Sequence, residues 1–432
     1  MLRTPVPGPI LRQLIASSTL LLLTACADTP ASAGAPEPAA APVPPVSTTP
    51  AAALESIAPR QDFGAWAAQF RQEALAAGIQ PRVFDAAFAG ISPDPAVIAA
   101  DRSQPEFTRP VWEYLEGALS EQRVRTGLAN LNRHADTLRT IESRYGVDRQ
   151  ALVAIWGMES NFGRVMGDKS VIRSLATLAY EGRRPQFAQD QLLAALRILQ
   201  SGDVSPPRMI GSWAGAMGQT QFIPTTYHQH AVDFDGDGRR DIWDSAPDAL
   251  ASTANYLQSS GWRLGQPWGF EVRLPKGFDY AQADMGLRKS LREWRQLGVA
   301  IPGDSTAHDE ETASLLLPAG HRGPAFLVLD NFRSILKYNN STSYALAIGL
   351  LSERFQNRGR ILGDWPRDDR PLSRSERIEL QTLLAGNGFD PGSADGIIGA
   401  NTRQAVRSLQ QRLGWPADGY PTHQLLQKLK GE

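Results

Sequence analysis

The sequence predicts a mainly α-helical protein that ends in a small three-helix domain. Apolar residues recur at helical spacing near the start of the folded region, through Phe63, Trp66 and Phe70, and later segments continue this period. A compact segment of about sixty residues follows the charged stretch PRDDRPLSRSE, where Ser373 and Glu376 form a capping box. The 432 residues exceed the roughly 100–200 residues of one typical domain, which agrees with two folded parts.

The charge balance argues against a nucleic-acid partner. The chain has 44 lysines and arginines against 45 aspartates and glutamates, a formal net charge of −1. Nucleic-acid-binding domains concentrate positive charge, and these totals indicate no strongly basic face. Abundant apolar residues favour a sizeable folded core instead.

Residues 1–25 have the layout of a lipoprotein signal peptide. Arg3 and Arg12 precede an apolar run, residues 14–23, that is too short to span a bilayer but suits the core of a signal peptide. The run ends in the lipobox-like sequence LTAC. Its Cys26 is the only cysteine of the chain, so no intramolecular disulfide can form. We therefore expect acylation of Cys26, with several acyl chains anchoring the protein to a membrane.

The residue after Cys26 indicates which membrane holds the anchor. In Gram-negative lipoproteins an aspartate at this position favours retention in the inner membrane, and this chain has Ala27. The expected location is the periplasmic face of the outer membrane; the alternative is an ordinary secretory signal and a soluble periplasmic protein. Residues 26–60 are rich in Ala, Pro, Ser and Thr and form a linker, which its prolines keep extended.

The segment ALVAIWGMESNFGR, residues 151–164, places a carboxylate on the apolar face of a helix. Leu152, Ile155, Trp156 and Glu159 share the i, i+3, i+4, i+7 spacing of one helical face. We expect Asp148 to cap this helix and Gly163 to end it, which puts Glu159 in the last turn. Burial, the negative end of the helix dipole and the lack of an adjacent cation all raise the pKa of Glu159, as a general acid requires. The alternative is a buried structural glutamate paired with Arg164 or Arg173.

Three motifs carry a resemblance to a known family. Glu159, Ser160 and Gly163 form a Glu-Ser-x-x-Gly motif, GSWAGAMGQTQFIPTTY spans residues 211–227, and YNNSTSYALAI spans residues 338–348. Together they resemble the membrane-bound lytic murein transglycosylase B family of the lysozyme-like superfamily. The resemblance implies an α+β lysozyme-like catalytic domain over residues 61–366 that acts on peptidoglycan glycan strands.

The resemblance also implies which residues contact the substrate. It places Ser212 on the carboxyl group of Glu159 as a hydrogen-bonding partner, and Gln221 on an N-acetyl sugar. Four further residues match positions that contact the substrate in the family: Tyr114, Tyr256, Tyr338 and Asn339. Taken by itself, a tyrosine such as Tyr114 is more often a core or surface aromatic residue than a platform for a sugar.

The loop DFDGDGRRDIWD, residues 233–244, follows the rule for calcium loops. Oxygen ligands are needed at positions 1, 3 and 5, and a glycine is needed at position 6 for the sharp turn. Asp233, Asp235, Asp237 and Gly238 fill these positions. The alternative is a solvated acidic turn, but mutual repulsion of the carboxylates favours a bound cation.

The later positions of this loop leave one ligand open. The carbonyl of Arg239 occupies position 7, and Asp241 occupies position 9, where it binds directly or through water. Position 12 holds Asp244, whose side chain is shorter than the usual bidentate glutamate, and Asp248 lies close to where the family's last ligand falls. We expect a structural Ca²⁺, because sensor loops usually come in pairs and the sequence contains one such loop.

Residues 367–432 form the predicted carboxyl-terminal domain. Its first helix begins at the capping box and ends at Gly388, a second runs from Thr402 to Gly414, and a third carries Leu425, Leu426 and Leu429. The stretches GFDPGSADGIIGANTRQAV and LQQRLGWPADG resemble the small peptidoglycan-binding domain found in many cell-wall enzymes. This domain is expected to bind peptidoglycan.

The expected reaction is the non-hydrolytic cleavage of the β-1,4 bond between N-acetylmuramic acid and N-acetylglucosamine, which leaves 1,6-anhydro ends. Hydrolytic glycosidases generally need two carboxylates, and Asp168, the nearest acidic residue after Glu159, lies in a predicted loop beside Lys169. Two alternatives are a hydrolytic muramidase and a non-catalytic lipoprotein that tethers the membrane to peptidoglycan. Protein partners are not predicted.

Overall fold

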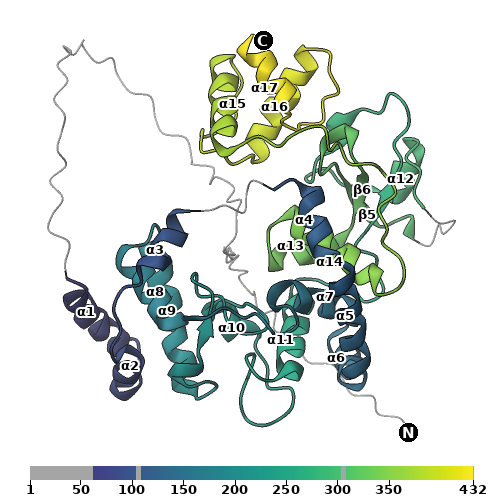
Figure 1. Cartoon of the computed structure of the whole chain (residues 1–432). Coiled ribbons are helices and arrows are strands. Elements are labelled where there is room, and N and C mark those ends of the chain that lie inside the picture. Colours follow the sequence, from purple (N-terminus) through teal and green to yellow (C-terminus); the bar gives the residue numbers. More distant parts are fainter. Residues whose placement is uncertain (1–61, 104–108, 303–307, 432) are drawn as a thin grey trace, which may run out of the picture.

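The computed structural model describes residues 62–103, 109–302 and 308–431 and confirms a mainly α-helical chain with few strands (Figure 1). The predicted signal peptide, the acylation site Cys26 and the linker lie outside the described residues. Within the described ranges, no helix is both long and apolar enough to cross a membrane.

Helices make up most of the structure before the carboxyl-terminal domain. The helices before and including the one that carries Glu159 are α1 (Phe63–Ala76), α2 (Pro81–Phe88), α3 (Pro95–Arg102), α4 (Val111–Ala118), α5 (Glu121–Arg133), α6 (Ala135–Tyr145) and α7 (Arg149–Ser160). Those after it are α8 (Val171–Glu181), α9 (Pro185–Ser201), α10 (Pro224–His230), α11 (Ala246–Ser259), α12 (Leu291–Gln296), α13 (Asp330–Tyr338) and α14 (Thr342–Arg354).

Two small antiparallel sheets supply the β content of the described residues. The first pairs β1 (Lys169–Ser170) with β2 (Ile210–Gly211) and joins the loop after α7 to the loop before α10. The second has the order β3-β6-β5-β4, with β3 (Gly269–Val272), β4 (Lys289–Ser290), β5 (Thr312–Leu316) and β6 (Ala325–Val328). A separate apolar cluster around Trp294 covers this sheet.

Helix α7 lies at the centre of the main core. Residues 151–157 are all buried, and α5, α6, α11 and α14 pack around the helix. A helix buried on every side presents its polar residues only at its ends. The core therefore fixes the position of the last turn, where Glu159 lies.

The carboxyl-terminal domain has the three predicted helices, α15 (Arg374–Gly386), α16 (Ala400–Arg412) and α17 (His423–Lys430), and its own apolar core. The capping box of Ser373 and Glu376 forms as predicted, because the serine side chain accepts from the Glu376 N–H and the glutamate accepts from the Ser373 N–H. Figure 1 shows the domain as a yellow-green unit above the rest of the chain.

Buried polar contacts hold this domain against the sheet region. The Arg407 guanidinium, with a side chain only 8% exposed, donates to the carbonyl of Ala283 and pairs with Asp284 at 3.1 Å. On the same face, Asp418 accepts from the backbone N–H of His321 at 2.8 Å and contacts its Nδ1 at 2.6 Å. These contacts give the Arg407 guanidinium and Oδ2 of Asp418 their partners in the neighbouring part of the chain, so the two parts pack in a defined orientation.

Candidate active site

The last turn of α7 ends earlier than the sequence predicts. Asn161, with φ 48°, adopts the left-handed conformation that closes the helix after Ser160, so the prediction that Gly163 ends it is wrong. Asp148 occupies the N-cap position but does not cap the helix with its side chain. It accepts instead from the Trp262 indole N–H at 2.9 Å.

The chain turns sharply after Glu159. Phe162 also has a positive φ, 61°, and its ring folds back onto Gly157, where any Cβ would lie only 2.7 Å from the ring. The Ser160 hydroxyl accepts from the Gly163 N–H at 3.0 Å and donates to the Trp156 carbonyl at 3.2 Å. Non-glycine residues in this region of φ are strained, and such strain clusters at functional sites.

Glu159 is partly exposed but closely surrounded by protein. In the described part of the chain no lysine or arginine forms an ion pair with it, and its Oε1 accepts a hydrogen bond from the Tyr344 hydroxyl at 2.5 Å. Burial raises the pKa of Glu159 to about 7, although the Tyr344 hydrogen bond acts in the opposite direction. The structure thus gives Glu159 the raised pKa that the sequence predicts, and neither Arg164 nor Arg173 neutralises it.

Tyr338 of α13 and Tyr344 of α14 lie close to this carboxyl group. Burial, followed by the charge of Glu159, raises the pKa of both Tyr338 and Tyr344 well above its usual range, so both hydroxyls are neutral donors. Tyr338 donates to the Thr220 carbonyl at 2.6 Å and so ties α13 to the loop of residues 211–222. Tyr344 was not among the residues singled out from the sequence, although it lies within the YNNSTSYALAI motif.

Tyr256 supports Tyr338 from within the core. Its ring lies 4.9 Å from that of Tyr338 in an edge-on arrangement, its hydroxyl donates to the Lys337 carbonyl, and the residue is only 4% exposed. Tyr256 thus packs against Tyr338 and orients its ring, and the substrate contact that the resemblance implies for Tyr256 stays a prediction.

Ser212 does not bond to Glu159 in the described structure. Its hydroxyl oxygen accepts from the N–H groups of Ala214 at 3.2 Å and Ala216 at 3.0 Å and so closes a turn within its own loop. The expected contact with the carboxyl group is made by Tyr344 instead. A short serine side chain readily accepts from nearby backbone N–H groups, which stabilises this turn.

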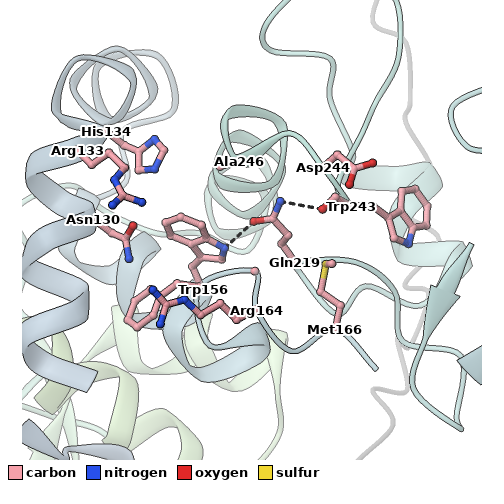
Figure 2. Close-up of a pocket in the computed structure, with 12 residues that line it drawn as sticks. Asn130, Arg133, His134, Trp156, Arg164, Met166, Gln219, Trp243, Asp244 and Ala246 are labelled. Carbon is pink, nitrogen blue, oxygen red and sulfur yellow. Dashed lines mark hydrogen bonds between the residues drawn. The ribbon is translucent and has the colours of Figure 1, made fainter. Parts of the chain in front are cut away.

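Gln221 and Gln219 join the two loops next to α7. The Gln221 amide donates to the carbonyls of Met166 at 3.1 Å and Gly218 at 2.9 Å, and Gln221 has a positive φ of 51°. Gln219 accepts from the Trp156 indole at 2.9 Å and donates to the Trp243 carbonyl at 3.0 Å (Figure 2). Gln219 is thus a buried structural link, whereas the amide oxygen of Gln221 has no hydrogen bond within the described residues.

The remaining predicted contacts lie on α4 and at the end of α13. Tyr114 is partly buried against the main core, and its helix α4 packs against α14, which carries Tyr344. Asn339 follows Tyr338 directly, and its amide oxygen is buried without a hydrogen-bond partner among the described residues. Both residues lie beside the tyrosines that surround Glu159.

No second carboxylate acts on Glu159 in the described structure. Asp168 is exposed in the loop before β1 and makes no hydrogen bond or ion pair with Glu159. The shift in the pKa of Glu159 has two causes, burial and Tyr344, and neither involves another acid. The site therefore has one acid with a pKa near neutrality.

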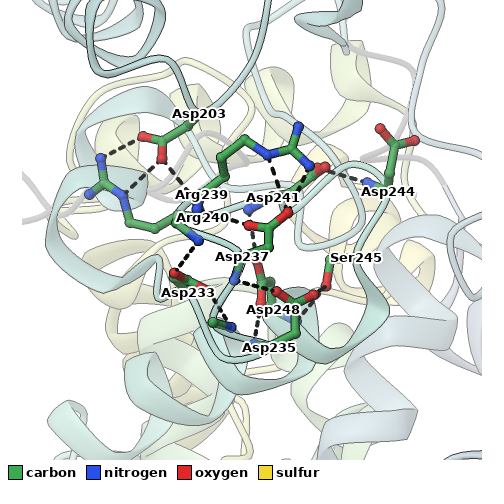
Figure 3. Close-up of polar contacts among 12 residues, drawn as sticks. Asp203, Asp233, Asp235, Asp237, Arg239, Arg240, Asp241, Asp244, Ser245 and Asp248 are labelled. Carbon is green, nitrogen blue, oxygen red and sulfur yellow. Dashed lines mark hydrogen bonds and ion pairs between the residues drawn. The ribbon is translucent and has the colours of Figure 1, made fainter.

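The acidic loop gathers three of the predicted metal ligands. Carboxylate oxygens of Asp233, Asp235 and Asp248 all lie within 4.8 Å of one another (Figure 3). Such a cluster of hard oxygen donors suits Ca²⁺. Asp248 also accepts from the Phe234, Asp235 and Asp241 N–H groups, so its carboxylate holds both ends of the loop.

The other acidic side chains of the loop have different partners. Asp237 pairs with the Arg239 guanidinium at 2.7 Å, and Asp244 pairs with Arg208. Asp241 is buried and accepts from the Trp243 and Asp244 N–H groups at 3.0 and 2.9 Å. Of the two residues left open for the last ligand, Asp248 lies in the cluster and Asp244 is turned toward Arg208.

Two family models match the chain. The model described as a transglycosylase SLT domain matches residues 62–353, and the model of a peptidoglycan binding domain matches residues 373–429. Over 246 residues the chain is 32% identical to membrane-bound lytic murein transglycosylase B of Escherichia coli strain K12. This alignment covers 56% of the chain and 66% of that protein.

Solved structures of known proteins have the same fold. A crystal structure of SltB3 from Pseudomonas aeruginosa in complex with NAG-anhNAM-pentapeptide superposes with a TM-score of 0.84 and 67% identity, covering 86% of the chain and all of that structure. The Escherichia coli lytic transglycosylase SLT35 in complex with calcium gives a TM-score of 0.59 and 28% identity, over 68% of the chain and 93% of that structure.

Proposed function

Since the chain belongs to the transglycosylase SLT domain family, we propose that it is a lytic transglycosylase. Its substrate is the β-1,4 bond between N-acetylmuramic acid and N-acetylglucosamine in peptidoglycan, and its product carries a 1,6-anhydro ring. The observation that carries this proposal is Glu159, an acid with a pKa of about 7 that is held by Tyr344 and, among the described residues, has no second carboxylate acting on it.

In the first step Glu159 acts as a general acid. Protonated Glu159 donates its proton to the glycosidic oxygen as the bond from C1 to that oxygen breaks, so the leaving sugar departs as a neutral alcohol. The acetamido group of the muramyl residue stabilises the positive charge that develops at C1. A pKa of about 7 keeps a substantial fraction of Glu159 protonated at neutral pH.

In the second step the same carboxylate acts as a general base. It removes the proton from the C6 hydroxyl of the muramyl residue as O6 bonds to C1, which closes the anhydro ring and returns Glu159 to its acid form. No water is consumed. An intramolecular hydroxyl has a high effective concentration, which lets ring closure outrun hydrolysis. The neutral Tyr344 hydroxyl stabilises the carboxylate between the two steps.

Substrate contacts are assigned to the residues around this carboxyl group. Gln221 is the candidate for the N-acetyl group, because its amide oxygen has no hydrogen bond within the described residues and is available to an acetamido N–H. Tyr114, Tyr338 and Asn339 complete the surroundings. The packing of α4 and α13 against α14, which carries Tyr344, supports this assignment.

Mass spectrometry of peptidoglycan digested by the lipid-free protein tests the proposal, with Glu159→Gln as the control. Anhydro-muropeptides that depend on Glu159 are expected. Reducing muramic ends would identify a hydrolytic muramidase with an unrecognised second acid. If wild type and variant both leave the polymer intact, the chain is a non-catalytic tether of the envelope.

The acidic loop is proposed as a structural calcium site. Asp233, Asp235 and Asp248 supply clustered oxygen donors, and Asp237, the Arg239 carbonyl and Asp241 follow in the loop order of known calcium sites. The relative of known structure that was solved with calcium supports this choice of ion. A bound cation offsets the repulsion between these carboxylates and fixes the loop. The loop starts eleven residues after Phe222, whose ring contacts that of Tyr338, so the ion stabilises a segment that leads into the site.

Membrane attachment and wall retention are proposed from the two ends of the chain. Acylation at Cys26 anchors the protein to the periplasmic face of the outer membrane, while the catalytic domain, residues 61–366, and the peptidoglycan-binding domain, residues 367–432, face the wall. Metabolic labelling with a palmitate analogue tests the anchor, using Cys26→Ala. Label that persists in the variant, or wild type recovered wholly in the soluble periplasm, contradicts it.

A further inference from the structure

Gln219 contacts both ends of the turn that carries Glu159. Its amide oxygen accepts from the indole N–H of Trp156, at 2.9 Å, and Trp156 lies three residues before Glu159 on α7. The same oxygen lies against Gly163, where any Cβ would be only 2.6 Å from it. Gln219 itself is only 6% exposed. One buried side chain thus contacts the chain before and after Glu159.

The main chain of Trp156 closes this turn. Its carbonyl accepts from the N–H groups of Asn161 and Phe162, the latter at 3.1 Å, and from the Ser160 hydroxyl at 3.2 Å. A displacement of Trp156 would therefore move the residues that follow Glu159. Because Asn161 and Phe162 have positive φ, the turn is strained and depends on its surroundings to stay closed.

Gln219 is also fixed to the end of the acidic loop, residues 233–244 (Figure 2). Its backbone N–H donates to the Ile242 carbonyl at 2.8 Å, and its side-chain amide donates to the Trp243 carbonyl at 3.0 Å. An indole N–H can only donate and a carbonyl can only accept, so one orientation of the amide satisfies both partners. The amide therefore cannot turn without losing a buried hydrogen bond, and it links the end of the acidic loop to Trp156.

We propose that Gln219 is a positioning residue for the acid, because it ties both ends of the turn around Glu159 to the acidic loop and so keeps that turn closed. Gln219 makes no hydrogen bond with Glu159 in the described structure, so it acts through Trp156 and Gly163. The inference rests on the proposed function, since it takes Glu159 to be the acid of the reaction.

The closed turn gives Glu159 its buried surroundings. Burial is the larger of the two influences on the pKa of Glu159 and raises it to about 7. Without Gln219 the turn opens, water reaches the carboxyl group, and the pKa of Glu159 falls toward the usual range of a glutamate. Loss of Gln219 thus lowers the pH above which the acid is ionised. A glutamine that only stabilised the fold would leave that pH unchanged.

The test compares Gln219→Met with Gln191→Met in the full chain. Methionine has nearly the length of glutamine but lacks both hydrogen bonds of the amide. Gln191 is the matched control, because it is only 3% exposed and its amide oxygen accepts from the N–H and the hydroxyl of Thr225, both at 3.1 Å. It lies on α9, which packs mainly on α8 and α10. Formation of anhydro ends from short soluble glycan strands gives kcat/KM between pH 5 and 9, and melting temperatures report stability.

A second variant, Trp156→Phe, approaches the same contact from the other side. It removes the indole donor but leaves the bond from Gln219 to the Trp243 carbonyl in place. The double variant Trp156→Phe/Gln219→Met shows whether the two substitutions act through one contact, because substitutions that break the same contact have non-additive effects. Trp156→Phe carries the test by itself if Gln219→Met does not fold.

The expected result is that the alkaline limb of kcat/KM moves to lower pH in Gln219→Met, by about half a pH unit or more. The loss of kcat/KM relative to wild type is then about three-fold greater at pH 8 than at pH 5.5. Trp156→Phe should shift the limb in the same direction, and the double variant should shift it no further than Gln219→Met. Gln191→Met should lower the melting temperature but keep the limb of the wild type.

A limb of Gln219→Met that coincides with that of the wild type overturns the inference, even where the melting temperature falls. An equal shift in Gln191→Met overturns it too, and so do fully additive shifts in the double variant. A wild-type enzyme that forms no anhydro ends at any pH instead contradicts the proposed function. The two failures are therefore distinguishable.

Discussion

The hydroxyl of Tyr344 donates a hydrogen bond of 2.5 Å to Oε1 of Glu159, although 185 positions separate the two residues in the sequence. The packing of α14 against α7 creates this contact. A donor aimed at the carboxylate stabilises the charged form of Glu159, whereas the surrounding burial stabilises the neutral form. The acid and base states of one residue are thus balanced by two opposing effects.

Tyr344→Phe should move the pH profile of the enzyme upward. Without the hydrogen bond the carboxylate loses a stabilising partner, so the pKa of Glu159 rises above about 7. A net hydrogen-bond contribution of about 0.5–1.5 kcal/mol corresponds to a rise of up to about one pH unit. Because Glu159 must be protonated for the first step, the alkaline limb of kcat/KM shifts to higher pH. Tyr280→Phe, remote in the sheet region, is the control, and a limb that stays in place contradicts this role.

Glu159→Gln should stabilise the fold at pH 8 but much less at pH 5. The pKa of Glu159 is raised from 4.5 to about 7 on folding. Below pH 4.5 the Glu159 carboxyl is protonated in the folded and the unfolded state, so it does not change the free energy of unfolding. Between pH 4.5 and 7 the carboxyl ionises only in the unfolded chain, so the free energy of unfolding falls as pH rises. Above pH 7 the wild type has lost the full amount, about 3 kcal/mol.

Thermal melting of both proteins across this pH range measures the effect. The difference in Tm between Glu159→Gln and wild type should widen from pH 5 to pH 8. An exposed glutamate of α5 gives the control variant, Glu121→Gln. A constant difference for Glu159→Gln would show that its carboxyl titrates normally.

Calcium should raise the melting temperature of the wild type and not that of Asp233→Asn. Asp233 contributes to the three-carboxylate cluster, and it also accepts from the Gly236 and Gly238 N–H groups. A ligand that binds only the folded state stabilises it by about 2.7 kcal/mol at a hundred times its Kd. The control is Asp190→Asn, an exposed aspartate of α9. An equal response of Asp233→Asn and wild type to calcium after chelation excludes this loop as the site.

Local features of the site follow from the sequence because they depend on neighbours within one helix or loop. The spacing around Glu159 predicts its apolar surroundings and its raised pKa, and the loop spacing brings Asp233 and Asp235 together. The capping box at Ser373 is local in the same sense, and it forms as predicted. Periodicity and capping report contacts that span only a few residues.

Contacts between residues far apart in the sequence explain why some predictions for the site were wrong or incomplete. Tyr344 reaches Glu159 from α14, and no local pattern distinguishes it from the neighbouring tyrosine Tyr338. Ser212 was assigned to the carboxyl group, but its hydroxyl is used by two N–H groups of a turn whose closure the sequence does not reveal. Asp244 is turned out of the metal cluster by Arg208, 36 positions earlier. Each outcome depends on a partner that only the folded chain supplies.

Arg407→Ala should loosen the carboxyl-terminal domain from the sheet region without unfolding it. The substitution leaves the Ala283 carbonyl without its donor and Asp284 without its ion pair, while the core around Leu380 and Leu425 is untouched. The substitution should weaken the association of the domain with the sheet region by about 1–3 kcal/mol. Most of this comes from the unpaired Ala283 carbonyl, because Asp284 is half exposed and its ion pair contributes little. Trypsin should then cleave the connecting segment after Arg367 about five-fold or more faster than in wild type.

The released fragments test what the domain binds. Arg412→Ala is the matched control for the cleavage rate, because Arg412 lies on the same helix as Arg407 but contacts Phe389 within its own domain. After cleavage of Arg407→Ala, the carboxyl-terminal fragment should sediment with purified sacculi, and the catalytic fragment should sediment less. The catalytic fragment should still cleave short glycan strands, since Glu159 and Tyr344 both belong to it. If the small fragment stays in the supernatant, wall retention comes from the catalytic domain, and the peptidoglycan-binding assignment of residues 367–432 is wrong.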